Sequence, residues 1–183
     1  MKDKIINTAK TFIRLKGFQF TIADIAKDVR ISKNTFYQHF ASKEEIIAHI
    51  IYEMKAESDE NQLKLLEDET IEPYEKLKRL LIVLPTDYDL INPITLSQLE
   101  SAFPKLHQQV GEIYHKDWDR FTDLYNRCNE DGMVEPMDID FFRELYIMGI
   151  SHLPTAPGMH QYSHKELLTK LVDQLFKGVP KLS

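Results

Sequence analysis

Apolar residues recur every three to four positions along most of this 183-residue chain, and no stretch alternates apolar and polar residues for long. A period of 3.6 residues places the apolar side chains of a segment on one face of an α-helix. A strand needs a period of two, because successive side chains point to opposite faces of a sheet. The sequence therefore predicts an all-α protein.

Capping residues mark where the first helices begin. The first helix is predicted over residues 2–16, and Gly17 supplies the left-handed conformation that ends it. Thr21 opens a capping box for a short second helix. Ser32 is the expected N-cap of a third helix, KNTFYQHF, and Ser42 that of a fourth, which reaches into the 60s.

The remainder of the chain continues as helices separated by prolines and loops. Further helices are expected near residues 73–84, 105–130, 138–153 and 164–177, with shorter pieces between the prolines at 85, 93 and 104. We predict about nine helices in two domains. Residues 1–47 form an N-terminal head, and residues 48–183 form a helical body.

Several features indicate a cytoplasmic protein without a membrane partner. The N-terminal sequence MKDKIINTAKTFI lacks the apolar core of a secretion signal. The longest strongly apolar run, LLIVL at residues 80–84, is far shorter than a membrane span. The one cysteine, Cys128, excludes an internal disulfide and is typical of a reducing compartment.

Charge is distributed unevenly along the chain. Residues 1–55 hold 10 Lys and Arg against 6 Asp and Glu, a net charge of +4, whereas the remainder holds 13 against 23, a net charge of −10. A basic head on an acidic body indicates that the head meets a polyanion. Chance clustering of charge is the alternative interpretation.

The segment RISKNTFYQHFASKEE at residues 30–45 predicts a helix-turn-helix. Ala26 is small enough to let the third helix cross the second, and Ile31, Phe36 and Phe40 can anchor the third helix in the core. Polar side chains remain for the other faces, and a helix of this kind fits the DNA major groove. The candidate DNA-binding residues are Thr21, Ser32, Lys33, Asn34, Thr35, Tyr37, Gln38, His39 and Lys43.

These side chains divide into two expected roles. Asn34 and Gln38 can pair with adenine, Lys33 can bind guanine, and the methyl group of Thr35 can meet that of thymine. Phosphate oxygens are the expected partners of Tyr37, His39 and Lys43, and of the backbone N–H groups where helices begin near Thr21 and Ser42. A helical hairpin with a solvated polar face is the alternative.

The segment TIADIAKDVRISKNTFYQHFASKEEII at residues 21–47 resembles the DNA-binding signature of TetR-type transcriptional regulators. The matching features are T-x-x-D-I-A, S-K-x-T-F-Y-x-H-F and S-K-E-E. The specific resemblance covers roughly residues 1–50. It implies a three-helix helix-turn-helix head on a ligand-binding and dimerisation bundle. It also implies a repressor that a small-molecule effector releases from a palindromic DNA operator.

Two positions depart from the pattern of that family. Arg30 stands in the turn where the family usually has Gly, and a non-Gly residue at positive φ costs on the order of 1 kcal/mol. Asn34 stands where the family often has Gly, and it can read a base. The base preference of the family therefore does not transfer to this chain.

The last two helices carry more apolar surface than one core needs. IDFFRELYIMGISHL at residues 139–153 is apolar nearly all round, and the final helix has doubled apolar positions such as Leu167 and Leu168. They can form a four-helix interface with a twofold mate, as the TetR resemblance implies, or close the core of a monomer. The predicted homodimer interface comprises Phe142, Tyr146, Ile150, Leu168, Leu171 and Leu175.

Aromatic residues with polar tips gather in the middle of the chain. The TetR resemblance implies that the helices after the head enclose a pocket for a small apolar or aromatic effector. Residues of this kind at helical spacing are also typical of an ordinary core. The candidate pocket residues are Tyr88, Phe103, Tyr114, Trp118, Phe121, Tyr125 and Met148.

Patterns of catalysis and metal binding are missing from the sequence. There is no Gly-rich phosphate loop and no nucleophile elbow, and His107 and His115 lack the spacing of metal ligands. We expect no enzyme activity, no cofactor and no metal. Two alternatives remain, a helical protein-interaction module without DNA binding and a small helical enzyme that uses Cys128 or a His.

Overall fold

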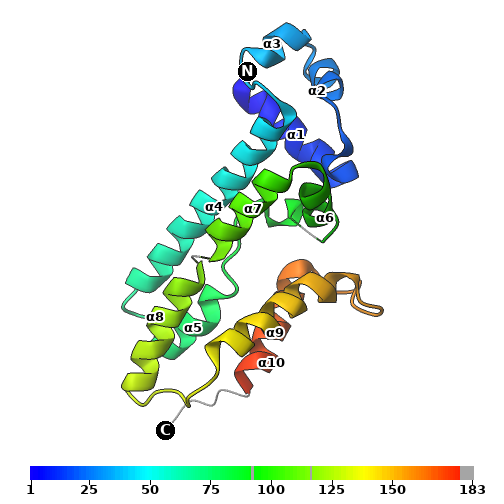
Figure 1. The fold of residues 1–183 in the computed structure, drawn as a ribbon. Helices are drawn as coiled ribbons and strands as arrows, with labels where there is room; N and C mark the ends of the chain where they lie inside the picture. Colours follow the sequence, from blue (N-terminus) through cyan, green and yellow to red (C-terminus); the bar gives the residue numbers. More distant parts are fainter. Residues whose placement is uncertain (92, 116, 178–183) are drawn as a thin grey trace. The chain divides into compact units, whose positions relative to one another are not determined.

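The computed structural model describes residues 1–91, 93–115 and 117–177, and it shows an all-α protein as predicted (Figure 1). The α-helices are α1 (Lys2–Lys16), α2 (Ile22–Val29), α3 (Lys33–Tyr37), α4 (Lys43–Glu67), α5 (Pro73–Leu80), α6 (Pro93–Ala102), α7 (Pro104–His115), α8 (Asp117–Glu130), α9 (Ile139–His152) and α10 (His164–Lys177). Three short 3-10 segments are η1 (Gly17–Gln19), η2 (Tyr88–Leu90) and η3 (Leu153–Thr155).

The chain divides into two compact units. Unit 1 contains residues 1–57 and 85–112, and unit 2 contains residues 58–84 and the chain from residue 113 onward. Helix α4 contributes its first part to unit 1 and its last part to unit 2. Unit 1 therefore includes the predicted head together with η2, α6 and most of α7.

The expected caps fix where the helices of the head begin. The Thr21 hydroxyl accepts a hydrogen bond from the Asp24 N–H at 3.1 Å, and the Asp24 carboxylate accepts one from the Thr21 N–H at 2.8 Å. The Ser32 hydroxyl caps α3 by accepting from the Thr35 N–H at 3.0 Å. These bonds satisfy N–H groups that have no partner within a helix. Below the caps, the core of unit 1 includes the buried side chains of Ile5, Ala9, Ile13, Phe20, Ile25, Phe36, Phe40, Ile46, Ile47 and Ile50.

The residue at position 17, directly after α1, needs to be glycine for two independent reasons. Its φ is +61°, which a residue with a Cβ atom adopts only with strain. A Cβ atom there would also lie 2.2 Å from the side-chain oxygen of Gln98. That oxygen accepts a hydrogen bond from the Phe18 N–H at 2.6 Å, so it joins α6 to the end of α1.

An ion-pair network also connects α1 to η2 and α4 within unit 1. Lys10 lies 2.9 Å from Glu53 and 2.8 Å from Asp87. Arg14 pairs with Asp87 and lies 2.7 Å from Asp89. Burial opposes the ionisation of Asp87, but hydrogen bonds from Lys10 and Arg14 outweigh it, so the pKa of Asp87 is lowered.

We expect this network to make unit 1 less stable in acid. Because the folded pKa of Asp87 is below its ordinary value of 3.8, its contribution is complete above that pH and is lost as pH falls through the folded pKa. Asp87→Asn should lower the free energy of unfolding by about 1 kcal/mol at pH 7 and flatten its dependence on pH below about 4. Urea unfolding at several pH values measures both, and a variant with the slope of the parent protein would contradict the assignment.

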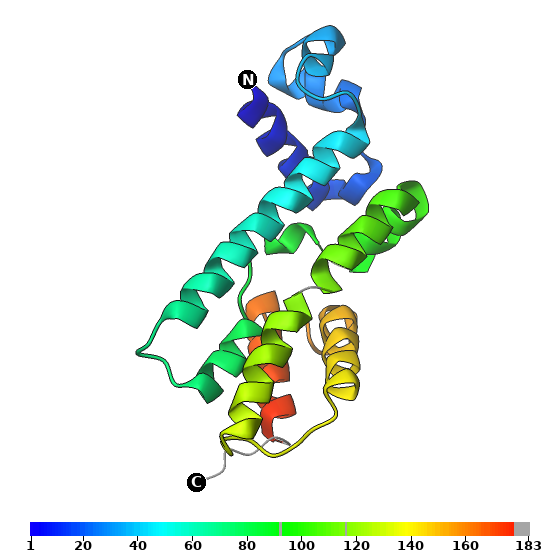
Figure 2. The same ribbon diagram turned by 60° about the vertical axis from the view of Figure 1, so that its left-hand side comes forward.

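The core of unit 2 is a cluster of aromatic rings from α8, α9 and α10. The rings of Phe121 and Phe142 stack with their centroids 5.6 Å apart. Trp118 meets Phe142 edge-on at 6.5 Å, and Phe176 does so at 5.7 Å. Rings in these arrangements attract one another beyond the gain from burying their area. Figure 2 shows α9 running beside α10, which brings these rings together.

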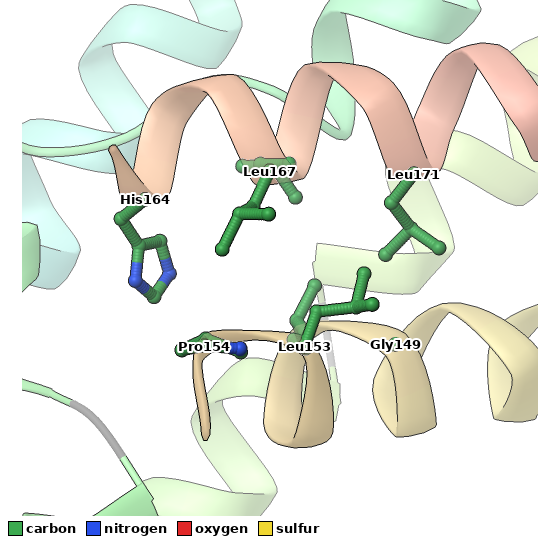
Figure 3. Close-up of a pocket in the computed structure, with 8 residues that line it drawn as sticks. Gly149, Leu153, Pro154, His164, Leu167 and Leu171 are labelled. Atoms are coloured by element: carbon green, nitrogen blue, oxygen red, sulfur yellow. The ribbon is translucent and has the colours of Figure 1, made fainter. Parts of the chain in front are cut away.

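Close contact between α9 and α10 depends on Gly149. A Cβ atom at this position would lie 2.5 Å from a terminal methyl carbon of Leu171, so a larger residue would force that side chain to move. Figure 3 shows Leu171 reaching from α10 toward Gly149 on α9. The hollow beside them has a volume of about 10 Å³, which is room for about one water molecule.

Candidate nucleic-acid interface

Helix α3 is held in the head by its apolar face. Phe36 is fully buried, and its ring packs against the rings of Tyr37 and Phe40 at centroid distances of 5.8 and 6.1 Å. The helix ends at Tyr37, earlier than predicted, because the chain turns there toward the cap of α4. In that turn the His39 N–H donates to the Phe36 carbonyl at 2.9 Å, the short bond of a tightened last turn.

The opposite face of α3 carries unpaired polar groups. Lys33, Asn34, Tyr37 and Gln38 are all exposed. Within the described part of the chain, their side-chain amide, ammonium and hydroxyl groups have no hydrogen-bond or ion-pair partner. A helix face whose polar groups have no partner within the protein is available to another molecule.

Three of the predicted DNA-binding residues support the fold as caps or neighbours of caps. The hydroxyl groups of Ser32 and Thr35 lie 2.9 Å apart, and the Thr21 hydroxyl accepts from the Asp24 N–H. Each of these hydroxyl groups therefore already takes part in a hydrogen bond within the head. His39 is half-buried in the turn after α3.

Lys43 points inward rather than to solvent. Its ammonium group donates to the Phe18 carbonyl and lies 4.9 Å from the ring centroid of Phe20 and 5.8 Å from that of Phe103. Burial lowers the pKa of Lys43, and the nearby Lys16 adds to the effect. The side chain expected to bind phosphate thus joins α4 to η1 within unit 1.

The predicted pocket residues are spread over both units. Phe121 and Tyr125 are buried in the core of unit 2, and the Tyr125 hydroxyl accepts from the Met137 N–H at 2.7 Å. Trp118 is half-buried beside them, whereas Met148 is 65% exposed. The remaining candidates are Tyr88 and Phe103, half-buried in unit 1, and Tyr114, whose side chain lies outside the described residues.

Two of the six predicted dimer residues are buried inside unit 2, and the other four are half-buried. Phe142 and Leu168 are buried, so a second chain cannot reach their side chains there. The Tyr146 hydroxyl donates to the Leu81 carbonyl at 2.8 Å, and Ile150, Leu171 and Leu175 are half-buried. The exposed apolar side chains of α9 are Phe141, Leu145, Ile147 and Met148.

The sequence pattern did not distinguish this exposed face, because the helical period alone does not give the phase of the helix. Phe141, Leu145 and Met148 are spaced by four and three residues, so they share one side of α9. Phe142 and Tyr146 share the side that faces the core. The sequence signal that could have separated them is this spacing, read together with the aromatic partners of Phe142.

The described residues contain no group of three or more His, Cys, Asp or Glu that could hold a metal ion. No helix among them is long and apolar enough to cross a membrane.

Sequence comparison with known proteins indicates the family of this chain. Residues 5–50, which include α1 to α3 and the start of α4, match the sequence model for bacterial regulatory proteins of the tetR family. An uncharacterised HTH-type transcriptional regulator, YvaF of Bacillus subtilis (strain 168), is 28% identical over 181 residues, which are 98% of this chain and 95% of that protein. The chain belongs to the TetR family.

Other TetR-like proteins resemble the head or the whole fold. Over 47 residues the chain is 49% identical to the biofilm operon icaADBC negative transcriptional regulator IcaR of Staphylococcus epidermidis, which is 25% of each chain. A transcriptional regulator from Saccharomonospora viridis, solved in complex with choline, has a TM-score of 0.72 at 20% identity, covering 100% of this chain and 98% of that one. At that identity the likeness concerns the fold alone.

The chain is thus a TetR-type helix-turn-helix transcriptional regulator. This family consists of DNA-binding regulators rather than enzymes, which decides against the two alternatives left open by the sequence. The exposed face of α3 lies within the matched residues.

Proposed function

We propose that this TetR-family protein is a cytoplasmic, homodimeric repressor that binds a roughly palindromic operator and leaves it when a small molecule binds the body. The observation that carries the proposal is the outer face of α3. Lys33, Asn34, Tyr37 and Gln38 are exposed and unpaired there, above a buried Phe36. Groups of this kind read base edges and hold phosphates when a helix enters the major groove.

A dimer follows from how little surface one head offers. Helix α3 has 5 residues, and a contact of that size is too small for tight, selective binding. Two heads about 34–36 Å apart would read two half-sites one helical turn apart. The exposed apolar side chains of α9 supply a surface that a second copy of the chain would cover.

Repression and effector release are proposed by comparison. IcaR, which is 49% identical to this chain over 47 residues, is a negative transcriptional regulator. The regulator from Saccharomonospora viridis was solved with choline, a small molecule. For this chain we propose an apolar or aromatic effector, given the many aromatic side chains of α8 and α9.

Helix α4 offers the route from effector to DNA. It is one continuous helix from Lys43 to Glu67, and its two ends belong to different units. An effector that favours one position of α4 would change the fit of the heads to successive grooves. Such a ligand acts only through its different affinity for the two states, and a near-complete switch needs a ratio of about 10⁴.

We expect substitutions on α3 to separate base reading from phosphate binding. Asn34→Ala and Gln38→Ala should change which bases are preferred, with about 1–3 kcal/mol of discrimination lost at each contacted base pair. Tyr37→Phe should weaken binding by a similar factor on every sequence, because the hydroxyl is proposed to bind phosphate. Selection of bound sequences from a pool of randomised DNA duplexes, followed by titration of each variant with the selected duplexes, measures both effects.

A control is available in the same unit of the protein. Thr11→Ala changes an exposed residue of α1 whose hydroxyl donates only to the Asn7 carbonyl of its own helix. This variant should keep the preference and the affinity of the parent protein. Equal losses of affinity on all sequences for Asn34→Ala, Gln38→Ala and Tyr37→Phe would contradict the division of roles.

A further inference from the structure

Arg30 adopts an uncommon backbone conformation at the turn between α2 and α3. Its φ and ψ are 59° and 48°, and it is the sole non-glycine residue with positive φ in the described part of the chain. Its N–H donates to the Lys27 carbonyl at 3.2 Å, which closes the C-terminus of α2. The left-handed conformation at this position is thus part of the turn that positions α3.

Arginine is a poor choice for this backbone conformation. A Cβ atom is strained in the left-handed region, and glycine adopts the same angles freely. Asn and Asp are partial exceptions, because their short side chains can bond to the local backbone, whereas Arg has no such compensation. Stability of the turn alone would therefore favour Gly or Asn over Arg30.

The side chain of Arg30 makes no polar or ring contact that would stabilise the described part of the fold. It is exposed, and among the described residues its guanidinium group has no hydrogen-bond, ion-pair or ring partner. The other arginine of unit 1 behaves differently, since Arg14 pairs with both Asp87 and Asp89. A strained residue that contributes no internal contact is a candidate for an external one.

The surroundings of Arg30 fit an anionic partner. Lys27 precedes it by three residues, on α2, and Lys33 follows it by three, in the first turn of α3. Both lysines are exposed and without an ion-pair partner among the described residues. The nearby Asp28 is exposed as well and accepts a hydrogen bond from Thr8 at 3.3 Å.

We propose that Arg30 is a phosphate-binding residue of the DNA interface, and that its contact offsets the strain in the turn. The inference rests on the proposed function, in which α3 enters the major groove. Phosphates of the DNA backbone line the rim of that groove, beside the turn that leads into α3. A guanidinium group binds phosphate oxygens with two parallel hydrogen bonds, which a lysine cannot do.

The test is to replace Arg30 by Gly and by Asn in the full-length protein. Both variants should unfold at a temperature about 2–4 °C higher than the parent protein, because the strain is relieved. Both should bind DNA about 10-fold more weakly if two heads each lose one phosphate contact. The slope of log affinity against log salt should become shallower by about 1.8 for the same reason.

Two duplexes and one control variant make the result decisive. Affinity and salt slope are measured on the selected operator and on a random duplex, since a phosphate contact is independent of sequence. Lys165→Gln removes an exposed charge from α10, far along the chain, and should change neither slope. Higher stability combined with a shallower slope on both duplexes would support the proposal.

An unchanged salt slope in Arg30→Gly, or the same change in Lys165→Gln, would overturn it. Lower stability in Arg30→Gly would also overturn it, because the strain argument would then fail. Failure of the proposed function has a different signature. The parent protein would show no preference for any duplex, while the slopes on random DNA would still report on Arg30.

Discussion

Phe142→Ala is expected to lower the free energy of unfolding of unit 2 by about 3–5 kcal/mol. The ring is 6% exposed, and it stacks on Phe121 with Trp118 and Phe176 packed against it edge-on. Alanine would leave a cavity that the surrounding helices can fill only in part. It would also remove three aromatic contacts at once.

Urea unfolding followed by tryptophan fluorescence measures this loss. Trp118 is the one tryptophan of the chain, and its ring centroid lies 6.5 Å from that of Phe142. Protein concentration is held constant between variants, because dimerisation adds to apparent stability. Leu63→Ala is the control, since Leu63 is an apolar residue of unit 2 that is 46% exposed.

The control should change the free energy of unfolding by no more than about 0.5 kcal/mol. A loss for Phe142→Ala as small as that of Leu63→Ala would show that the aromatic cluster is not a closely packed core. That outcome would also restore Phe142 as a candidate for the surface between two chains.

Phe141→Glu combined with Met148→Glu is expected to turn the proposed dimer into a monomer and to lower operator affinity by at least about 100-fold. Phe141 and Met148 are 63% and 65% exposed, and they lie two turns apart on one side of α9. A carboxylate buried between two chains without a partner is strongly unfavourable. A single head would then keep one half-site and lose the other.

Sedimentation at micromolar concentration and titration of operator DNA measure the two effects. Circular dichroism should show an unchanged helix content, because neither side chain is part of the core. Leu63→Glu is the matched control, an exposed leucine on α4 that should leave both dimer and affinity intact. A double variant that remains dimeric would place the interface on another surface.

Local sequence signals predicted the helix starts of the head well, because caps act over a few residues. Thr21 with Asp24, and Ser32 with Thr35, make the expected bonds in the structure. Gly17 has the expected positive φ, although its ψ of −147° lies outside the left-handed helical region. Each of these features depends on neighbours within three or four positions, so the sequence contains the information.

The features that depend on distant neighbours were harder to predict. Lys43 points to Phe18 and Phe103, which are 25 and 60 residues away along the chain. The orientation of α9 depends on which aromatic residues of α8 and α10 meet it, so Phe142 faced the core and Phe141 did not. A periodic pattern shows that a helix has an apolar face. When a helix has two apolar faces, only its packing against other helices decides which of them turns to the core.

Selective DNA binding by the outer face of α3 is the central claim, and one measurement tests it directly. The full-length protein is titrated against the DNA upstream of its own gene and against a shuffled duplex, at several salt concentrations. We predict binding at least about 10³-fold tighter to the upstream DNA, with a steep fall in affinity as salt rises. Equal affinity for both duplexes at every salt concentration would contradict the account.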